Sequence, residues 1–293
     1  MSLPRFEDFA PRSVDEACKL LDEAGEGGRL MAGGTDLLIR LSLGTMRASK
    51  LIGLRTVEGI DGLTFDRDKG LTIGAMALLS DIERDIAIRE HYPAIAEAAL
   101  ETATVQIRNM ATLVGNICNA SPCADNAQVP MALGADVALA SSDGDRRVLL
   151  DDFFIGPGQT VIEAGEIVTE IHVPRPKEGT GAAYKNIGAR SRVDITSVSV
   201  AAVITVKGDR IEEARIVLGG VAPTPIRVPR GEAILVGANL DDAVLAQAAA
   251  QAVAACKPID DVRATADYRR RMVGVLTQRA VRQAHERAVG GVG

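Results

Sequence analysis

The sequence predicts two consecutive units, an α/β unit over residues 1–176 and an α+β unit over residues 177–293. In the first stretch, short apolar runs typical of strands alternate with segments of helical periodicity. Residues 174–179 then bring prolines and a glycine together. Beyond them, three alternating runs follow one another before two helical segments close the chain. This change of pattern places the predicted boundary at residue 176.

The first predicted helix begins at a capping box, in which Ser13 and Glu16 can satisfy free N–H groups reciprocally. Apolar residues follow on one side of this helix, which we expect to end at Gly25. A strand over 29–32, a turn at Gly33-Gly34 and a short helix over 35–43 come next.

Further along the first unit, the same criteria predict two strands, two helices, an irregular glycine-bearing loop and a hairpin. These are strands 51–54 and 71–75, helix 93–102, the loop 112–122, helix 126–133, and the hairpin of 137–140 with 147–150.

The second unit is predicted to be a three-stranded antiparallel sheet backed by helices. Its strands are expected at 182–187, 197–206 and 211–219, and Lys207-Gly208-Asp209 is a tight hairpin signal between the last two. Helices are expected at 241–256 and 266–289. In the last helix, apolar residues recur at four-residue steps from Tyr268 to Ala288.

Composition excludes several classes of function. A formal net charge of −6 disfavours a nucleic-acid-binding protein, which normally carries a basic excess. No apolar stretch reaches the roughly 18 residues that span a bilayer, and the first residues lack the apolar core of a signal peptide. We therefore expect a cytoplasmic protein without an integral membrane segment. Trp is absent and aromatic residues are 3% of the chain, which disfavours ligand binding by stacking.

No catalytic or metal-binding set stands out. Of the four cysteines only Cys118 and Cys123 are close in sequence, unlike the tight groups that hold iron–sulfur clusters. The three histidines are far apart, which gives little support for a metal site or a Ser-His-Asp triad. We predict no metal ligands and no acid–base catalytic residue in this chain.

Two glycine-bearing stretches are the most informative motifs. The first runs from Leu30 to Leu37 around Gly33-Gly34, and the second runs from Thr112 to Pro122 around Gly115. Glycine lets the backbone approach a ligand and turn its N–H groups toward an anion. A turn between a strand and a helix is a favourable place for a phosphate, although the G-x-G-x-x-G spacing of a Rossmann site is absent.

The two stretches together resemble the FAD-binding medium subunit of the molybdenum hydroxylases. That family includes carbon monoxide dehydrogenase, xanthine dehydrogenase, nicotinate dehydrogenase and 4-hydroxybenzoyl-CoA reductase. The resemblance covers nearly the whole chain and extends through 166–174, 184–195 and 266–271. The cysteine-rich insertion of the 4-hydroxybenzoyl-CoA reductase branch is missing, which disfavours that branch.

The resemblance implies an N-terminal FAD-binding domain of the p-cresol methylhydroxylase type and a C-terminal domain with a three-stranded sheet. It also implies non-covalent FAD, because no histidine anchor is evident. The residues that the family pattern assigns to the cofactor are Met31, Ala32, Gly33, Gly34, Thr35, Asp36, Leu37, Ala111, Thr112, Gly115, Asn116, Cys118, Asn119, Ala124, Asp125, Ile167, Val168 and Lys185. Among them, Ile167 and Val168 are expected to contact a ring system, or else to be plain strand core. Asp125 is expected near ribose or ribityl hydroxyls.

One position departs from the family pattern. The family carries a lysine near the flavin at the place of Asn186, whereas Lys185 stands one residue earlier here. Neighbouring residues of a strand face opposite ways, so Lys185 reaches the flavin only if a bulge re-aims it.

By resemblance, the chain is an oxidoreductase subunit that passes electrons from iron–sulfur clusters through FAD to an external acceptor. Molybdopterin and 2Fe-2S clusters are expected in a large and a small partner subunit, in a dimer of heterotrimers. Two alternatives remain open from the sequence. One is a self-sufficient FAD-dependent oxidoreductase with its own small organic substrate, and the other is a scaffold subunit that binds flavin weakly or not at all.

Overall fold

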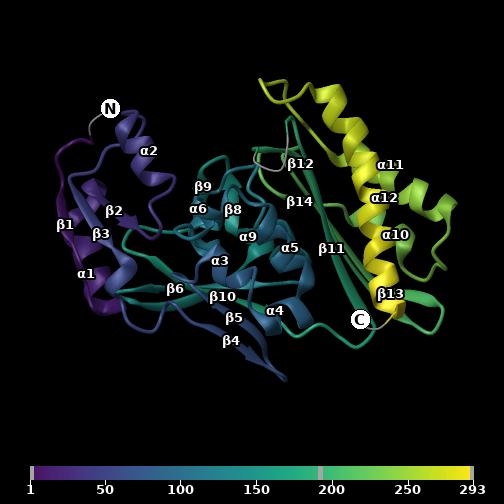
Figure 1. Ribbon diagram of the computed structural model, residues 1–293, viewed down its shortest axis with the longest axis horizontal. Helices are drawn as coiled ribbons and strands as arrows, with labels where there is room; N and C mark the ends of the chain where they lie inside the picture. Colours follow the sequence, from purple (N-terminus) through teal and green to yellow (C-terminus); the bar gives the residue numbers. More distant parts are fainter. Residues whose placement is uncertain (1–2, 191–193, 291–293) are drawn as a thin grey trace.

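The computed structural model describes residues 3–190 and 194–290 of the chain. Three main sheets follow one another along the long axis of the molecule: a small parallel sheet, a five-stranded sheet and a four-stranded sheet (Figure 1). Among these residues, no helix has both the length and the apolar character needed to cross a membrane.

The small sheet consists of β1 (Glu7–Phe9), β3 (Lys50–Gly53) and β2 (Gly28–Met31), with β3 in the centre and parallel to both neighbours. Helix α1 (Val14–Ala24) packs beside it. The N-cap half of the capping box is confirmed, since the Ser13 side chain accepts the Glu16 N–H at 3.1 Å and the helix ends at Gly25. The Glu16 side chain accepts the Arg12 N–H at 2.7 Å, one residue before the N-cap. Helix α2 (Leu37–Ser42) follows β2 after the glycine turn.

The five-stranded sheet has the order β4 (Leu63–Asp66), β5 (Gly70–Gly74), β10 (Ile167–Pro174), β6 (Asp136–Ser141), β7 (Gly144–Leu149), and every pair is antiparallel. The last strand of the first unit, β10, therefore lies in the middle of its sheet. Among the described residues, parallel pairing is confined to the small sheet.

Short helices and one small strand pair complete the first unit. They are α3 (Leu79–Ile82), α4 (Ile86–His91), α5 (Pro93–Glu101), α6 (Val105–Arg108), α7 (Leu113–Cys118), α8 (Gln128–Ala132), α9 (Leu150–Phe153), β8 (Phe154–Gly156) and β9 (Gln159–Thr160).

The four-stranded sheet has the order β11 (Thr180–Gly188), β12 (Thr196–Lys207), β13 (Arg210–Gly219), β14 (Ile226–Arg227) and is antiparallel throughout. The expected three strands are present, but the expected strand number is wrong. The fourth strand, β14, is only two residues long. This is too short to show the alternation of apolar and polar residues from which strands are predicted.

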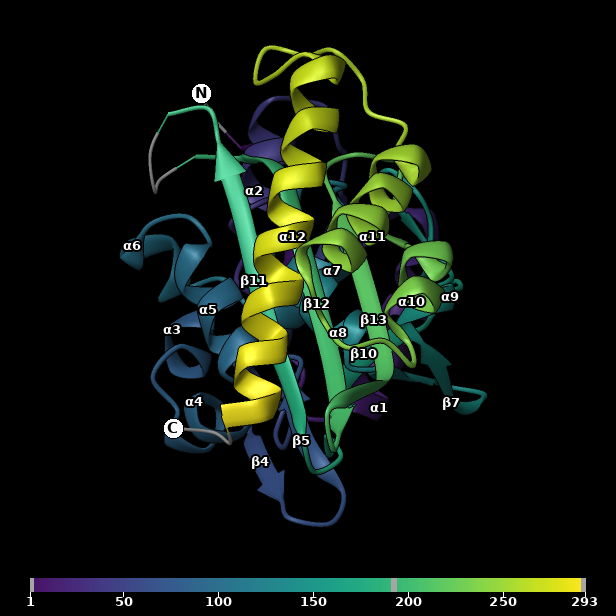
Figure 2. The same cartoon turned by 90° about the vertical axis from the view of Figure 1, so that its right-hand side faces the viewer.

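Helices α10 (Pro229–Leu235), α11 (Asp242–Ala255) and α12 (Ala266–Gly290) cover one face of this sheet (Figure 2). Its other face packs on the first unit, so alternate residues of β11 belong to different cores: Ala183 packs with the helices and Tyr184 with the first unit. On α12 the buried stripe begins at Arg269 and Val273, whereas Tyr268 is 40% exposed.

Candidate functional site

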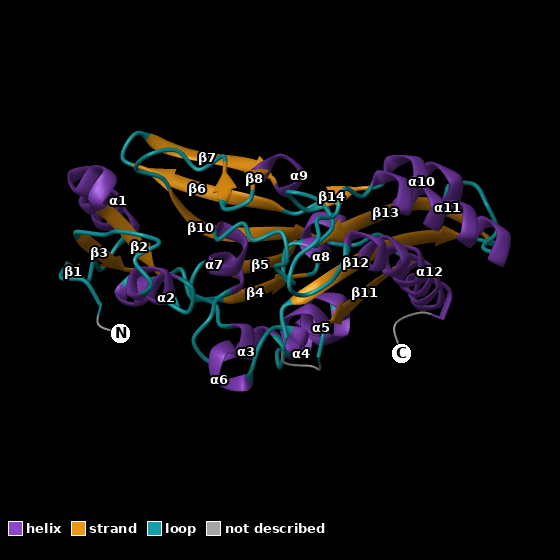
Figure 3. Ribbon diagram, turned by 90° about the horizontal axis from the view of Figure 1, so that it is seen from above, coloured by secondary structure: helices purple, strands orange, loops and turns teal. Residues whose placement is uncertain are grey.

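A cavity of about 1010 Å³ is lined by residues of both units. This volume is at the upper end of the roughly 300–1,000 Å³ typical of small-molecule sites. Both glycine stretches contribute to its wall. Seen from above, α7 lies between the small parallel sheet and the four-stranded sheet (Figure 3).

The first glycine stretch is confirmed as a turn between a strand and a helix. Gly34 has φ +71°, a left-handed conformation that glycine adopts without strain. Gly33 lies directly on the backbone that leads into the second stretch, because a Cβ at this position would be 2.0 Å from the Met110 carbonyl oxygen and 2.9 Å from the Ala111 Cα. Only glycine allows this close approach of the two backbones.

The turn presents a run of backbone donors. For the N–H groups of residues 33–37, the described part of the chain provides no hydrogen-bond acceptor, and the Asp36 side chain does not cap α2. Residues 33–37 all line the cavity. Donors at the start of a helix are normally satisfied by a cap, water or a ligand, and together they favour an anion.

The second glycine stretch was predicted to be irregular, and this is wrong, because Leu113–Cys118 form α7. Its N-cap is Thr112, whose Oγ1 accepts the Gly115 N–H at 3.0 Å. A Cβ on Gly115 would be 3.8 Å from the Ala32 Cβ, so the two stretches are neighbours in space. The Arg40 guanidinium, which donates to Asn119 Oδ1 at 3.3 Å, links them again.

The structure brings sixteen of the eighteen residues expected at a cofactor to this one cavity. They are Ala32, Gly33, Gly34, Thr35, Asp36, Leu37, Ala111, Thr112, Gly115, Asn116, Cys118, Asn119, Ala124, Asp125, Ile167 and Val168. Met31 and Lys185 do not line it. Met31 ends β2, and its sulfur lies 3.5 Å from where a Cβ on Gly34 would be.

Lys185 is turned away from the cavity. It pairs with Val200 across β11 and β12, and Val200 belongs to the core beneath the C-terminal helices. The register shift between β11 and β12 lies between Ile187 and Gly188, beyond the lysine, so no bulge re-aims it. Asn186 faces the opposite way, toward Asp125 and Thr196.

Asp125 joins the two units at the cavity wall. Its Oδ1 accepts the Tyr184 hydroxyl and the Thr196 hydroxyl, each at 2.6 Å. Burial raises the pKa of this carboxyl, and the same hydrogen bonds oppose that rise. A carboxylate held by residues from the C-terminal sheet fixes the position of that sheet against the first unit.

The two ends of the cavity differ in exposure. One end is bounded by Leu54, Ala75, Ile167 and Val168, which are all buried. At the other end lie exposed residues from the C-terminal unit, including Ile195, Lys257 and Ile259. We call the part lined by these buried residues the closed end and the part lined by the exposed C-terminal residues the open end.

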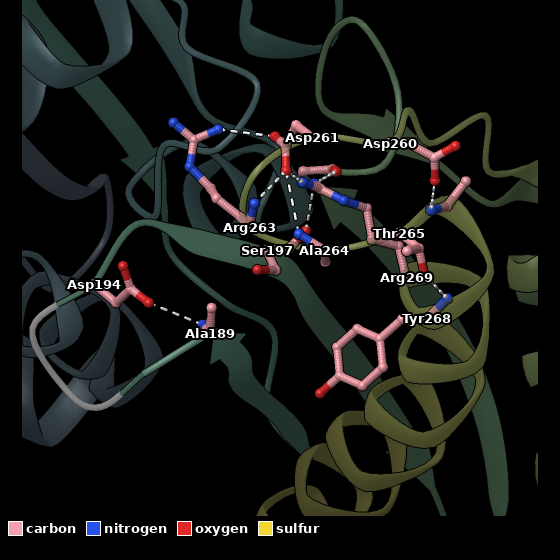
Figure 4. Close-up of polar contacts among 12 residues, drawn as sticks. Ala189, Asp194, Ser197, Asp260, Asp261, Arg263, Ala264, Thr265, Tyr268 and Arg269 are labelled. Atoms are coloured by element: carbon pink, nitrogen blue, oxygen red, sulfur yellow. Dashed lines mark hydrogen bonds and ion pairs between the residues drawn. The ribbon is translucent and has the colours of Figure 1, made fainter.

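Apart from Asp36 and Asp125, sequence reasoning missed the charged residues of this cavity. Arg29, Arg40 and Glu166 lie on the first unit, and Arg190, Asp194, Lys257, Asp261, Arg263 and Arg269 lie at the open end. Figure 4 shows Asp261 bonded to Arg263 and Arg269 beside the start of α12. No local motif marks these residues, because the fold brings them together from separate segments.

Comparison with known proteins fits this geometry. The family described as "FAD binding domain in molybdopterin dehydrogenase" matches residues 4–176, more than half of the chain. The chain belongs to this family. A second family, described as "CO dehydrogenase flavoprotein C-terminal domain", matches residues 182–284.

Individual relatives cover about nine tenths or more of this chain. The carbon monoxide dehydrogenase medium chain of Hydrogenophaga pseudoflava is 35% identical over 286 residues, covering 97% of this chain and 98% of the relative. A putative xanthine dehydrogenase FAD-binding subunit of Escherichia coli is 31% identical, with 89% and 90% covered. A solved carbon monoxide dehydrogenase structure from H. pseudoflava has a TM-score of 0.94 at 34% identity, covering 98% of this chain and 99% of that one.

Proposed function

We propose that this chain binds FAD non-covalently in the cavity, as the flavoprotein subunit of a molybdenum-containing hydroxylase. The backbone N–H groups of residues 33–37 and the start of α7 hold the diphosphate. The observation that carries the proposal is this run of N–H groups, for which the described residues provide no acceptor. The run lies beside the backbone that leads into the second glycine stretch, at a distance that leaves no room for a Cβ on Gly33. Arg29 and Arg40 add positive charge to the same wall.

The difference between the two ends orients the cofactor. Adenine occupies the closed end, where Ile167 and Val168 give it apolar contacts. The isoalloxazine ring occupies the open end, because it must exchange electrons with molecules outside this chain. Asp125 and Asn116 then lie along the connecting part, where sugar and ribityl hydroxyls need polar partners.

The residues of this chain bind, orient and shield the cofactor, and FAD supplies the redox chemistry. Bound FAD would receive electrons that pass from molybdopterin in a large subunit through the 2Fe-2S clusters of a small subunit, and would deliver them to an external acceptor. The assembly is a dimer of heterotrimers in the cytoplasm. The first domain, residues 1–176, is of the p-cresol methylhydroxylase type, and residues 177–293 form the second.

Purification of the native assembly tests this function. We expect the chain to co-purify with two further subunits, with flavin, iron and molybdenum in the same fractions. Release of intact FAD by mild denaturation would show that the cofactor is not covalently held. A purified chain that oxidises an organic substrate without partners would overturn the proposal in favour of a self-sufficient oxidoreductase, and one that binds no FAD would favour a scaffold.

A further inference from the structure

The open end of the cavity carries a segment, residues 256–265, that connects α11 to α12. Lys257 on this segment is exposed, and among residues 3–190 and 194–290 no carboxylate lies within ion-pair distance of it. The Arg263 side chain is 33% exposed and also lines the cavity. Neither residue has a role in holding the cofactor in the proposed function.

The segment is fixed in place before any ligand arrives. The Lys257 N–H donates to the Val221 carbonyl at 2.7 Å. Asp261 Oδ1 accepts the N–H groups of Arg263 and Ala264, at 2.8 and 3.2 Å (Figure 4). Hydrogen bonds therefore hold the backbone from which both cations extend.

A buried arginine anchors the segment from below. Arg269 donates to the Ser197 and Gly220 carbonyls at 2.9 and 2.7 Å, and to Asp261 at 2.7 Å. Because Asp261 is engaged by Arg269, it cannot fully neutralise Arg263 as well. A net positive charge remains at this rim.

A count of charges supports this conclusion. Within the described ranges, the ionisable residues that line the open end are four cations and two carboxylates, a net charge of +2; they are Arg190, Lys257, Arg263, Arg269, Asp194 and Asp261. The neighbouring Asp260, which accepts the Ala266 N–H at the start of α12, leaves the balance positive at +1. The whole chain carries −6, so this rim is a local reversal of sign. Clefts lined by one sign of charge attract ligands of the other sign.

We infer that Lys257 and Arg263 form a docking subsite for a small anionic electron acceptor at the flavin end of the cavity. The inference rests on the proposed function, which places the isoalloxazine ring there. The acceptor carries phosphate, carboxylate or an equivalent negative charge, and it takes electrons from reduced flavin while held at the rim.

Reoxidation of reduced flavin tests the subsite without knowledge of the natural substrate. The FAD-loaded protein is reduced with dithionite, freed of excess reductant and mixed rapidly with ferricyanide, a trianion, or with p-benzoquinone, which is neutral. Reduced flavin gives up two electrons and its protons go to solvent. Two ferricyanide ions take one electron each, and one quinone takes two electrons and two protons.

The variants are Lys257→Gln, Arg263→Gln and the double variant. Lys19→Gln is the matched control, since Lys19 is an exposed lysine on α1 outside the cavity lining. We expect the second-order rate constant with ferricyanide to fall about three- to tenfold in the double variant, and to depend less on ionic strength. The rate with p-benzoquinone, and both rates in the control, should stay within about twofold.

Each other outcome has a distinct meaning. A double variant that keeps its flavin absorbance and the wild-type ferricyanide rate overturns the inference and leaves the proposed function standing. An equal loss with both acceptors also overturns it, because charge is then not what matters. If the substitutions impair folding, the salt dependence of the wild-type protein decides: a ferricyanide rate that does not fall with added salt overturns the subsite. A protein without bound FAD overturns the proposed function and the inference together.

Discussion

Substitution of Gly33 by alanine should separate the two glycine stretches and weaken FAD binding. The new Cβ would lie 2.0 Å from the Met110 carbonyl oxygen, 2.7 Å from its carbon and 2.9 Å from the Ala111 Cα. All three atoms belong to the backbone, so no side chain can rotate to relieve the contact. The turn or the segment before α7 must move instead.

The size of the effect can be estimated from other overpacked sites, where an added methyl group lowers the free energy of unfolding by about 1–3 kcal/mol. If that strain appears in the geometry that binds the diphosphate, the Kd for FAD rises by about 5- to 150-fold. Gly62→Ala is the matched control. A Cβ at Gly62 would meet no atom within 4 Å, and this glycine does not have a positive φ.

The assay is titration of the apoprotein with FAD, followed by the change in flavin fluorescence, with thermal unfolding of the apoprotein measured alongside. We expect a large rise in Kd for Gly33→Ala and little change for Gly62→Ala. If Gly33→Ala keeps its stability and binds FAD as tightly as the control, the close contact of the two stretches is not what shapes the site.

Three further substitutions test other parts of the account. Thr112→Val removes the N-cap of α7 and should lower the free energy of unfolding by about 0.5–2 kcal/mol, with Thr112→Ser largely restoring it in denaturant titrations. Lys185→Gln should leave the FAD Kd and the flavin midpoint potential unchanged, because the lysine lies on the face away from the cavity; a shift of the potential would show that its side chain reaches the flavin. For Asp261, burial raises the pKa, but the Arg263 N–H, the Arg269 guanidinium and the Ala264 N–H lower it to about 2 overall. A lowered pKa stabilises the fold above about pH 4, so Asp261→Asn should reduce the Tm at pH 7 and the difference should shrink as the pH falls from 4 toward 2, whereas a constant difference would contradict the ion pair.

Features set by neighbouring residues were predictable from the sequence. The N-cap at Ser13 and the helix end at Gly25 depend only on residues at the ends of one helix, and both were confirmed. The strand, glycine turn and helix of the first stretch were also correct, because the apolar run and Gly33-Gly34 are contiguous. Local signals of this kind survive in the fold because tertiary contacts reinforce them.

Features set by long-range pairing were not predictable. Nothing near Ile167 indicates that β10 inserts between strands that precede it by tens of residues. The helix at Leu113–Cys118 was missed because its glycine and polar residues favour a loop, whereas the Thr112 cap and the contact of Gly115 with Ala32 stabilise a helix.

The charged rim was missed for the same reason. Lys257 and Arg263 are ordinary surface residues in sequence, and only the packing of α12 and Arg269 on the four-stranded sheet brings them to the cavity. The face of the sheet on which Lys185 lies depends on the register of β11 with β12. A shift of one residue would move its side chain to the other face, and the sequence alone does not give that register.

Competition between nucleotides tests the central claim most directly, namely that backbone N–H groups of the two glycine stretches clasp a diphosphate. Apoprotein is titrated with FAD, with riboflavin, and with ADP or adenosine as competitors of FAD. The account predicts that FAD binds far more tightly than riboflavin and that ADP displaces it where adenosine does not. Riboflavin binding as tight as that of FAD, with ADP no better than adenosine, would contradict it.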